Sequence, residues 1–220
     1  LALVKRSLVL DPANAVYHNN YGNIFRQTGA FEEAIAAYQK AIRYAPDYAV
    51  AYNNLGVALN RTGQETDAEV AFRQAIRIDP HYFDAYNNLG TGLYLQARYD
   101  EAVVVFREAV SVGPIEPSAR NNLANVLAML GKIDEAEQVC RDAVEIDGGH
   151  AISQVTLGGV LESQGKFIEA EIAFRTALDL NPKMPAAWNN LGNLFRAQGR
   201  PIDAINAFRR AIALEPGNAM

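Results

Sequence analysis

The feature that most constrains this chain is a repeat of 34 residues. Residues 51–56 read AYNNLG, the same letters return at residues 85–90, and AWNNLG stands at residues 187–192. Laying the chain out at this period gives six full units without insertion or deletion: 15–48, 49–82, 83–116, 117–150, 151–184 and 185–218. Self-similarity at such a period indicates a solenoid of stacked, similar units.

Each unit is predicted to contain two helices. In unit 49–82 the first helix is predicted to run from about residue 51 to residue 62 and to end at Gly63, which suits the left-handed C-terminal position. Acidic residues begin the second helix, where they favour the positive end of its dipole, and Pro80 ends it. Residues 1–14 match the second half of a unit, so we expect them to be the second helix of a truncated preceding repeat.

The apolar residues of each helix occupy one stripe. On a helical wheel Tyr52, Leu55 and Leu59 share one arc of the first helix, with Gly56 at its edge, and Phe72 belongs to the matching stripe of the second helix. Neither helix can bury its stripe alone, so the units must stack.

These residues resemble a known family. The last unit matches the signature of the tetratricopeptide repeat, and the residues that carry the match are Trp188, Leu191, Gly192, Phe195, Ala204, Phe208 and Pro216. The resemblance recurs in all six units. It implies an all-α, right-handed superhelical solenoid of helix-turn-helix repeats, with the first helices lining a concave groove that holds a partner.

Composition narrows the function classes. The chain carries a net charge of −5, so no basic excess favours a nucleic acid. A single cysteine, Cys140, excludes an internal disulfide, and no apolar run is long enough to cross a bilayer. We therefore expect a cytoplasmic chain with neither a nucleic-acid nor a membrane partner.

No residue pattern points to catalysis. His18, His81 and His150 fall in different columns of the repeat, without metal-ligand spacing. Cys140 takes the place of a phenylalanine and is predicted to be a small buried residue, with a reactive thiol as the alternative. We expect no cofactor and no enzymatic activity within the array. A catalytic domain, such as a glycosyltransferase, would lie outside this chain.

Asparagine columns are the candidate binding residues. On the wheel Val50, Asn53, Val57, Asn60 and Arg61 lie opposite the packing arc and Asn54 lies at its border, so these columns are predicted to face the groove. The Asn54 column holds asparagine in five of the six units: Asn20, Asn54, Asn88, Asn122 and Asn190. It resembles the asparagine ladder in the repeat domain of O-linked N-acetylglucosamine transferase and the similar runs of kinesin light chain. That resemblance implies contacts to the backbone of an extended peptide.

Two other interpretations of this column stay open. The asparagines can record duplication of an ancestral unit, or their amides can bond to a neighbouring helix. The adjacent column, with Asn53 and Asn87, is a second candidate for peptide contact. A carboxylate clamp is less favoured, because the family pattern would place a lysine in this adjacent column.

Variable columns of the first helix are predicted to select the bound sequence. Arg26 and Arg61 would favour acidic residues towards one end, and Tyr94, Leu95 and Met129 would receive a hydrophobic side chain. The alternative is that these residues merely cover a neighbouring helix.

The sequence therefore predicts a module that binds protein or peptide segments, either as the recognition part of a larger protein or as a free-standing scaffold or adaptor. No polar capping helix follows the last unit, and Ile205, Phe208 and Ile212 would lack a neighbour. End-to-end self-association is therefore also expected.

Overall fold

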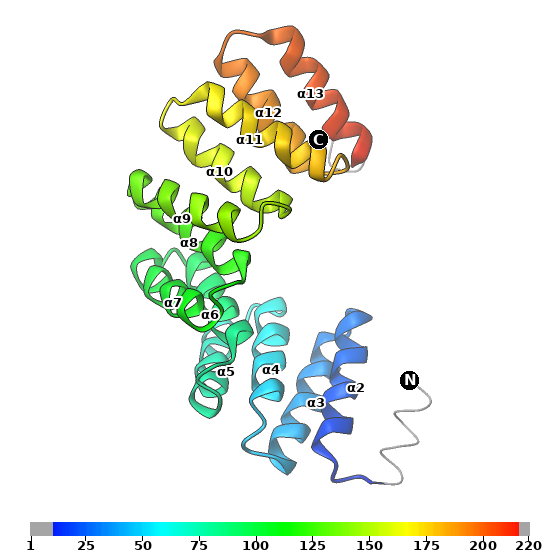
Figure 1. Cartoon of the computed structure of the whole chain (residues 1–220). Coiled ribbons are helices and arrows are strands. Elements are labelled where there is room, and N and C mark those ends of the chain that lie inside the picture. The colour runs from blue at the N-terminus through cyan, green and yellow to red at the C-terminus, as the bar shows by residue number, and fades with distance from the viewer. Residues whose placement is uncertain (1–10, 216–220) are drawn as a thin grey trace. The chain divides into compact units, whose positions relative to one another are not determined.

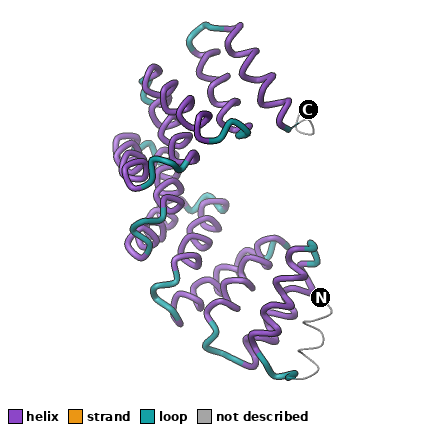
Figure 2. Tube along the Cα trace, turned by 45° about the vertical axis from the view of Figure 1, so that its right-hand side comes forward, coloured by secondary structure: helices purple, strands orange, loops and turns teal. Residues whose placement is uncertain are grey.

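The structure, a computed structural model, describes residues 11–215. It divides into two compact units, Leu1–Val112 and Gly113–Met220, and each is described by itself. The helix expected at residues 1–14 lies outside the described residues, apart from residues 11–14. Throughout residues 11–215 every regular element is an α-helix (Figure 2), which confirms the all-α class.

Antiparallel helix pairs build both units (Figure 1). The first unit contains α2 (Ala15–Gln27), α3 (Phe31–Tyr44), α4 (Ala49–Arg61), α5 (Glu65–Ile78), α6 (Phe83–Leu95) and α7 (Tyr99–Val112). The second unit contains α8 (Pro117–Met129), α9 (Ile133–Ile146), α10 (Ala151–Ser163), α11 (Phe167–Leu180), α12 (Pro185–Ala197) and α13 (Pro201–Leu214). In each 34-residue repeat the even-numbered helix is the first helix and the odd-numbered helix is the second.

Turn chemistry sets where the first helices end. Gly63, two residues after α4, has φ 75°, and the glycines at the same place in four other repeats also lie in the left-handed region, as the sequence predicted. Ala97 is the exception, with φ 58°. An L-residue with a Cβ costs about 1–2 kcal/mol in this conformation, so this turn is strained.

A glycine of the first helix and an aromatic ring of the second helix pack closely in most repeats. A Cβ added to Gly56 would lie 2.6 Å from Cε1 of Phe72, far inside van der Waals contact. The same contact recurs at Gly22, Gly90, Gly158 and Gly192. The ring therefore packs directly on the backbone of the first helix, and alanines such as Ala68 and Ala75 fill the remaining buried positions of the second helix.

Contacts between helices are local along the chain. Within each unit the described helices pack only against helices that are one or two positions away along the chain. Helix α4, for example, contacts its own second helix α5, the preceding helix α3 and the first helices α2 and α6. A first helix inside a unit is thus covered from several sides, which decides which of its columns remain accessible.

Candidate functional site

One stripe of each described first helix is left partly or fully exposed by its neighbours, except at Thr156 of α10, which is only 9% exposed. In α4 it consists of Val50, Asn54, Val57 and Arg61, spaced so that they share one face, and all four are partly or fully exposed. We call the corresponding positions of all first helices the first-helix stripe. Its members in the first unit are Val16, Asn20, Asn23 and Gln27 of α2, the four residues of α4, and Asp84, Asn88, Thr91 and Leu95 of α6. Its members in the second unit are Ser118, Asn122, Asn125 and Met129 of α8, Ile152, Thr156, Gly159 and Ser163 of α10, and Ala186, Asn190, Asn193 and Ala197 of α12.

The prediction that the Asn53 column faces the groove was wrong for three of its members, whereas Asn87 is half-buried and Asn189 is exposed. Asn53 is only 5% exposed, and Asn19 and Asn121 in the same column are 3% exposed. The wheel considered one helix and its partner, whereas the next repeat covers this side of the first helix. Asn60, also assigned to the groove, turns towards the next repeat, where its amide nitrogen would lie 3.5 Å from a Cβ built on Gly92.

In the first unit the two asparagine columns form a hydrogen-bonded ladder. Asn54 Nδ2 donates to Asn19 Oδ1 at 2.9 Å, and Asn88 Nδ2 donates to Asn53 Oδ1 at 2.9 Å. Asn53 Nδ2 in turn donates to the phenol oxygen of Tyr82 at 3.3 Å, and burial raises the pKa of that phenol. These bonds to a neighbouring helix are one of the alternatives that the sequence left open. Each uses one of the two amide N–H groups of the donor.

The ladder does not continue through the second unit. Asn121 Nδ2 donates instead to Ser153 Oγ at 3.0 Å, and Thr156 bonds to the carbonyl of Ile152 in its own helix. Val155 stands where Asn190 would need an acceptor. Within residues 11–215 the side chain of Asn190 has no hydrogen bond, so its whole amide is available on the stripe.

The arginines of the variable columns lie against aromatic side chains of second helices. The Arg61 guanidinium lies 5.4 Å from the centroid of the Phe31 ring, and Arg26 lies beside Tyr38, where it opposes the rise in pKa that burial gives the phenol. Both arginines therefore cover aromatic residues of second helices.

The apolar side chains in these columns are more exposed to solvent. Leu95 of the first unit is 73% exposed and Met129 of the second unit is 57% exposed. Tyr94 is half-buried, with its ring centroid 5.6 Å from that of Tyr99. Leu95 and Met129 are thus accessible apolar side chains within their own units.

A column of carboxylates that the sequence reading missed joins successive second helices. Glu137 accepts from Arg141 in its own helix and from Lys166 at the start of α11, both at 2.7 Å. The ion pairs of Glu69 with Arg73 and Arg98, and of Glu171 with Arg175 and Arg200, have the same pattern. Lys166 and Arg141 lower the pKa of Glu137 to about 2. A basic residue 29 positions after each glutamate was the signal in the sequence.

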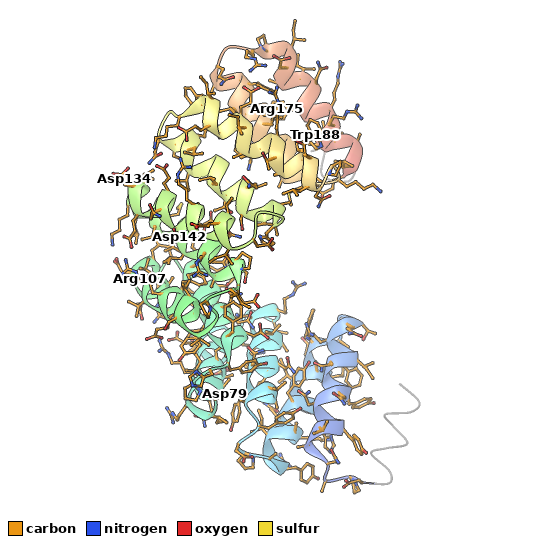
Figure 3. The ribbon with its side chains drawn as sticks, viewed as in Figure 1. Asp79, Arg107, Asp134, Asp142, Arg175 and Trp188 are labelled. Atoms are coloured by element: carbon orange, nitrogen blue, oxygen red, sulfur yellow. The ribbon has the colours of Figure 1, made fainter. Side chains whose placement is uncertain are left out.

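A second feature that the sequence did not predict is a hydrogen bond between the first helix of a repeat and the loop that precedes it. The fourth residue of four first helices donates to a proline carbonyl six residues earlier: His18 Nε2 at 2.8 Å, Tyr86 at 3.3 Å, Arg120 at 2.7 Å and Trp188 at 3.1 Å. The four side chains differ in size and charge but each carries an N–H or O–H. Trp188, which lies among the C-terminal helices of the second unit, is labelled in Figure 3.

Residues 11–215 show neither a metal-binding cluster nor a membrane-spanning helix. They contain no group of three or more His, Cys, Asp and Glu side chains placed to hold a metal ion. Within the same residues no helix combines the length and the apolar character needed to cross a membrane. Cys140 is fully buried, and burial raises the pKa of its thiol to about 12, which disfavours the reactive thiolate.

Paired helices that recur every 34 residues and stack through near-neighbour contacts define an α-helical repeat protein. Sequence models described as TPR repeat or tetratricopeptide repeat match residues 22–63, 49–82, 84–113, 116–183 and 156–219. The chain belongs to the tetratricopeptide repeat family.

Solved structures of similar fold agree with this assignment. YrrB, described as a TPR protein with an unusual peptide-binding site, is 24% identical with a TM-score of 0.63, over 84% of this chain and 95% of that one. PilF of Pseudomonas aeruginosa is 20% identical with a TM-score of 0.76, over 94% of each chain. PilW, a type IV pilus biogenesis factor, is 17% identical with a TM-score of 0.80, over 93% of this chain and 95% of that one. No curated protein matches the sequence.

Proposed function

We propose that the array binds an extended segment of another protein along the first-helix stripe and performs no chemistry of its own. The observation that carries this proposal is the exposed amide chemistry of the stripe. Asn190 keeps its whole amide, while Asn54 and Asn88 each keep one N–H and the carbonyl oxygen after their ladder bonds are made. The described peptide-binding site of YrrB, a protein of the same fold, supports it.

Asparagine suits this task because its amide offers both a donor and an acceptor. An extended backbone presents alternating N–H and C=O groups that need both kinds of partner. In the first unit the ladder bonds also fix the side chains of Asn54 and Asn88 before a partner arrives, which reduces the entropy lost on binding. Contacts of this kind supply affinity for many sequences. Leu95 and Met129 would then choose among them through apolar contact.

Asn190 gives the cleanest test. Peptides selected by display on the intact chain would be measured against Asn190→Ala by fluorescence anisotropy. One neutral hydrogen bond contributes about 1 kcal/mol, so we expect the Kd to rise about fivefold. The melting temperature should not fall, because no described residue bonds to this amide and alanine is the better helix former.

The matched control is Thr66→Ala, an exposed residue of a second helix away from the stripe. Equal affinity of the two variants for every selected peptide would refute the binding role of the asparagine column. Asn54→Ala and Asn88→Ala are less informative, because each also removes a bond between repeats and should cost about 1 kcal/mol of stability.

We further propose that the array is the recognition module of a larger protein, on the resemblance of its asparagine columns to those of O-linked N-acetylglucosamine transferase. A free-standing scaffold is the alternative. Sequencing the gene beyond both ends of this chain distinguishes the two: an adjoining catalytic domain supports the module, and its absence supports the scaffold.

End-to-end self-association remains a prediction. On α13, Ile205 and Ile212 are each 50% exposed. Sedimentation velocity over a range of protein concentrations should show association that Ile205→Glu weakens, since a charge in an apolar contact is costly. A monomer at all concentrations would contradict it.

A further inference from the structure

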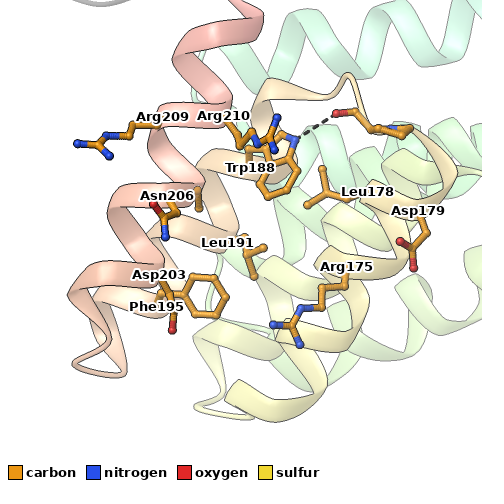
Figure 4. A pocket seen from close by; sticks show the side chains of 12 residues that line it. Arg175, Leu178, Asp179, Trp188, Leu191, Phe195, Asp203, Asn206, Arg209 and Arg210 are labelled. Carbon is orange, nitrogen blue, oxygen red and sulfur yellow. Dashed lines mark hydrogen bonds between the residues drawn. The ribbon is translucent and has the colours of Figure 1, made fainter.

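A second surface lies on the opposite side of the repeats, between the second helices of the second unit. Here α11, α12 and α13 enclose an open groove of about 1010 Å³ (Figure 4). Its apolar lining includes Leu178, Trp188 and Leu191, while Arg175 of α11 and Arg210 of α13 contribute cations from the two walls. We call it the α11–α13 groove.

The tryptophan in this groove is held in place. Trp188 is the single tryptophan of the chain, and its indole N–H donates to the carbonyl of Pro182 at 3.1 Å. The indole is half-buried, so part of the ring remains open to the groove. At the far end Phe195 is covered, since the Arg200 guanidinium lies 4.2 Å from its ring centroid. The accessible apolar floor is therefore centred on Trp188.

The two walls of the groove differ in their unpaired charges. Arg175 is paired with Glu171 at 2.7 Å, and Asp203 is paired with Arg200 at 2.8 Å. Among the described residues neither Arg209 nor Arg210 has an ion-pair or hydrogen-bond partner, and Asp179 on the opposite wall has none either. Figure 4 shows Arg210 beside Trp188 and Arg209 directed away from the groove. Among the described residues the α13 wall thus carries an unpaired cation, Arg210, and the α11 wall carries an unpaired carboxylate, Asp179.

The equivalent groove of the first unit lacks these cations. It lies between α3, α4 and α5, has a volume of about 560 Å³, and carries Gln39 and Gln74 where the second unit carries Arg175 and Arg210. Tyr52 takes the place of Trp188. The repeat therefore folds without a cation at either position. The ion pair with Glu171 accounts for Arg175, whereas Arg210 has no partner among the described residues and needs another explanation.

We propose that the α11–α13 groove docks an acidic peptide segment that carries an aromatic side chain. The aromatic ring packs on the indole of Trp188 in an offset or edge-on arrangement, and a neighbouring carboxylate pairs with Arg210. Arginine suits this role because its planar guanidinium is weakly hydrated and binds a carboxylate through two N–H groups. Asp179 on the facing wall repels acidic residues, so the acidic end of the segment lies on the α13 side.

This surface is distinct from the first-helix stripe. The stripe belongs to the exposed face of the first helices, whereas two of the three helices that form the groove are second helices. The intact chain therefore carries a second site, with a specificity that comes from charge and an aromatic ring rather than from backbone contacts.

Trp188 reports on its own site, because no other tryptophan contributes to the emission. The probe is the acetylated, amidated hexapeptide Gly-Asp-Glu-Phe-Ser-Gly, which is acidic on one side of its phenylalanine only, titrated into the intact chain at low salt. We expect a saturable change in tryptophan emission. Replacing the probe's phenylalanine with alanine, or its acidic residues with lysine, should abolish the change.

Arg210→Gln installs the residue type of the first-unit groove and should weaken binding about tenfold. Arg77→Gln removes the same charge from an exposed site on α5 and should leave binding unchanged. Asn190→Ala should also leave it unchanged, which separates this site from the stripe. The proposal is overturned by the absence of a saturable signal up to about 1 mM peptide, or by equal binding of Arg210→Gln and Arg77→Gln.

Discussion

At the scale of single residues, a glycine of the first helix is needed because an aromatic ring of the second helix packs on its backbone. Gly158 and Phe174 show the pairing, in which an added Cβ would lie 2.5 Å from the ring. One repeat departs from it at both positions: Ala124 replaces the glycine and Cys140 replaces the ring, and both are fully buried. A larger first-helix residue is thus matched by a smaller second-helix residue. This explains the cysteine without any role for its thiol.

The exchange predicts a coupled pair of substitutions. Cys140→Phe alone should destabilise the chain by about 1–3 kcal/mol, because the ring would meet the methyl group of Ala124. Adding Ala124→Gly should recover much of this loss, although glycine itself costs about 1 kcal/mol in a helix. Urea denaturation of the two single variants and the double variant measures the coupling. Strictly additive effects would show that the two positions are independent.

At the scale of the helices, glycine and proline residues near the helix termini set where each helix ends, and side-chain contacts join successive repeats. Gly63 and Pro80 follow the two helices of their repeat as the sequence predicted, and α4 begins at Ala49, two residues earlier than expected. The neighbouring second helices are then joined by the carboxylate column. Glu137 links α9 to α11 through Lys166, and its side chain is only 14% exposed.

This column makes part of the stability depend on pH. The pKa of Glu137 in the folded chain is about 2, below its ordinary value of 4.5. Its contribution is therefore fully present above pH 4.5 and is lost as the pH falls from 4.5 to about 2. Glu137→Gln should cost about 1 kcal/mol near neutral pH, and the difference from the parent chain should shrink through that window.

Urea midpoints measured from pH 7 to pH 2 test this expectation. Glu145→Gln is the matched control, because Glu145 is an exposed carboxylate of the same helix without an ion pair among the described residues. A constant difference between Glu137→Gln and the parent chain at all pH values would argue against the proposed role of the carboxylate.

At the scale of the whole molecule, stability should be a sum of local terms. Within each unit the described helices pack only against their near neighbours, as in other repeat arrays. Gly56→Ala and Gly192→Ala each place a methyl group 2.6 Å from a ring, in the second and the last repeat. Each should destabilise the chain by about 1–3 kcal/mol.

The double variant tests additivity. Its loss should equal the sum of the single losses within about 0.5 kcal/mol, as for substitutions without shared partners. Denaturation followed by circular dichroism provides the measurement. A coupling above about 1 kcal/mol would instead show that strain is transmitted along the array.

The sequence by itself determined the period, the all-α class and the helix ends. These follow from local physics: the fixed φ of proline, the left-handed freedom of glycine at positions such as Gly63, and the 3.6-residue periodicity of the apolar stripes. It also identified the asparagine columns, because repetition at 34 residues is visible in one chain.

Only the tertiary structure decided which of those columns is accessible. Asn53 and Asn54 are adjacent in sequence, so their side chains point about 100° apart around the helix axis. The next repeat buries Asn53, whereas Asn54 is partly exposed on the stripe. Arg61 likewise covers Phe31, and Trp188 becomes part of a groove, through contacts with other helices. A wheel drawn for one helix pair omits these neighbours. In a stacked array they cover as much of a first helix as its own partner does, so accessibility is a property of the assembled repeats.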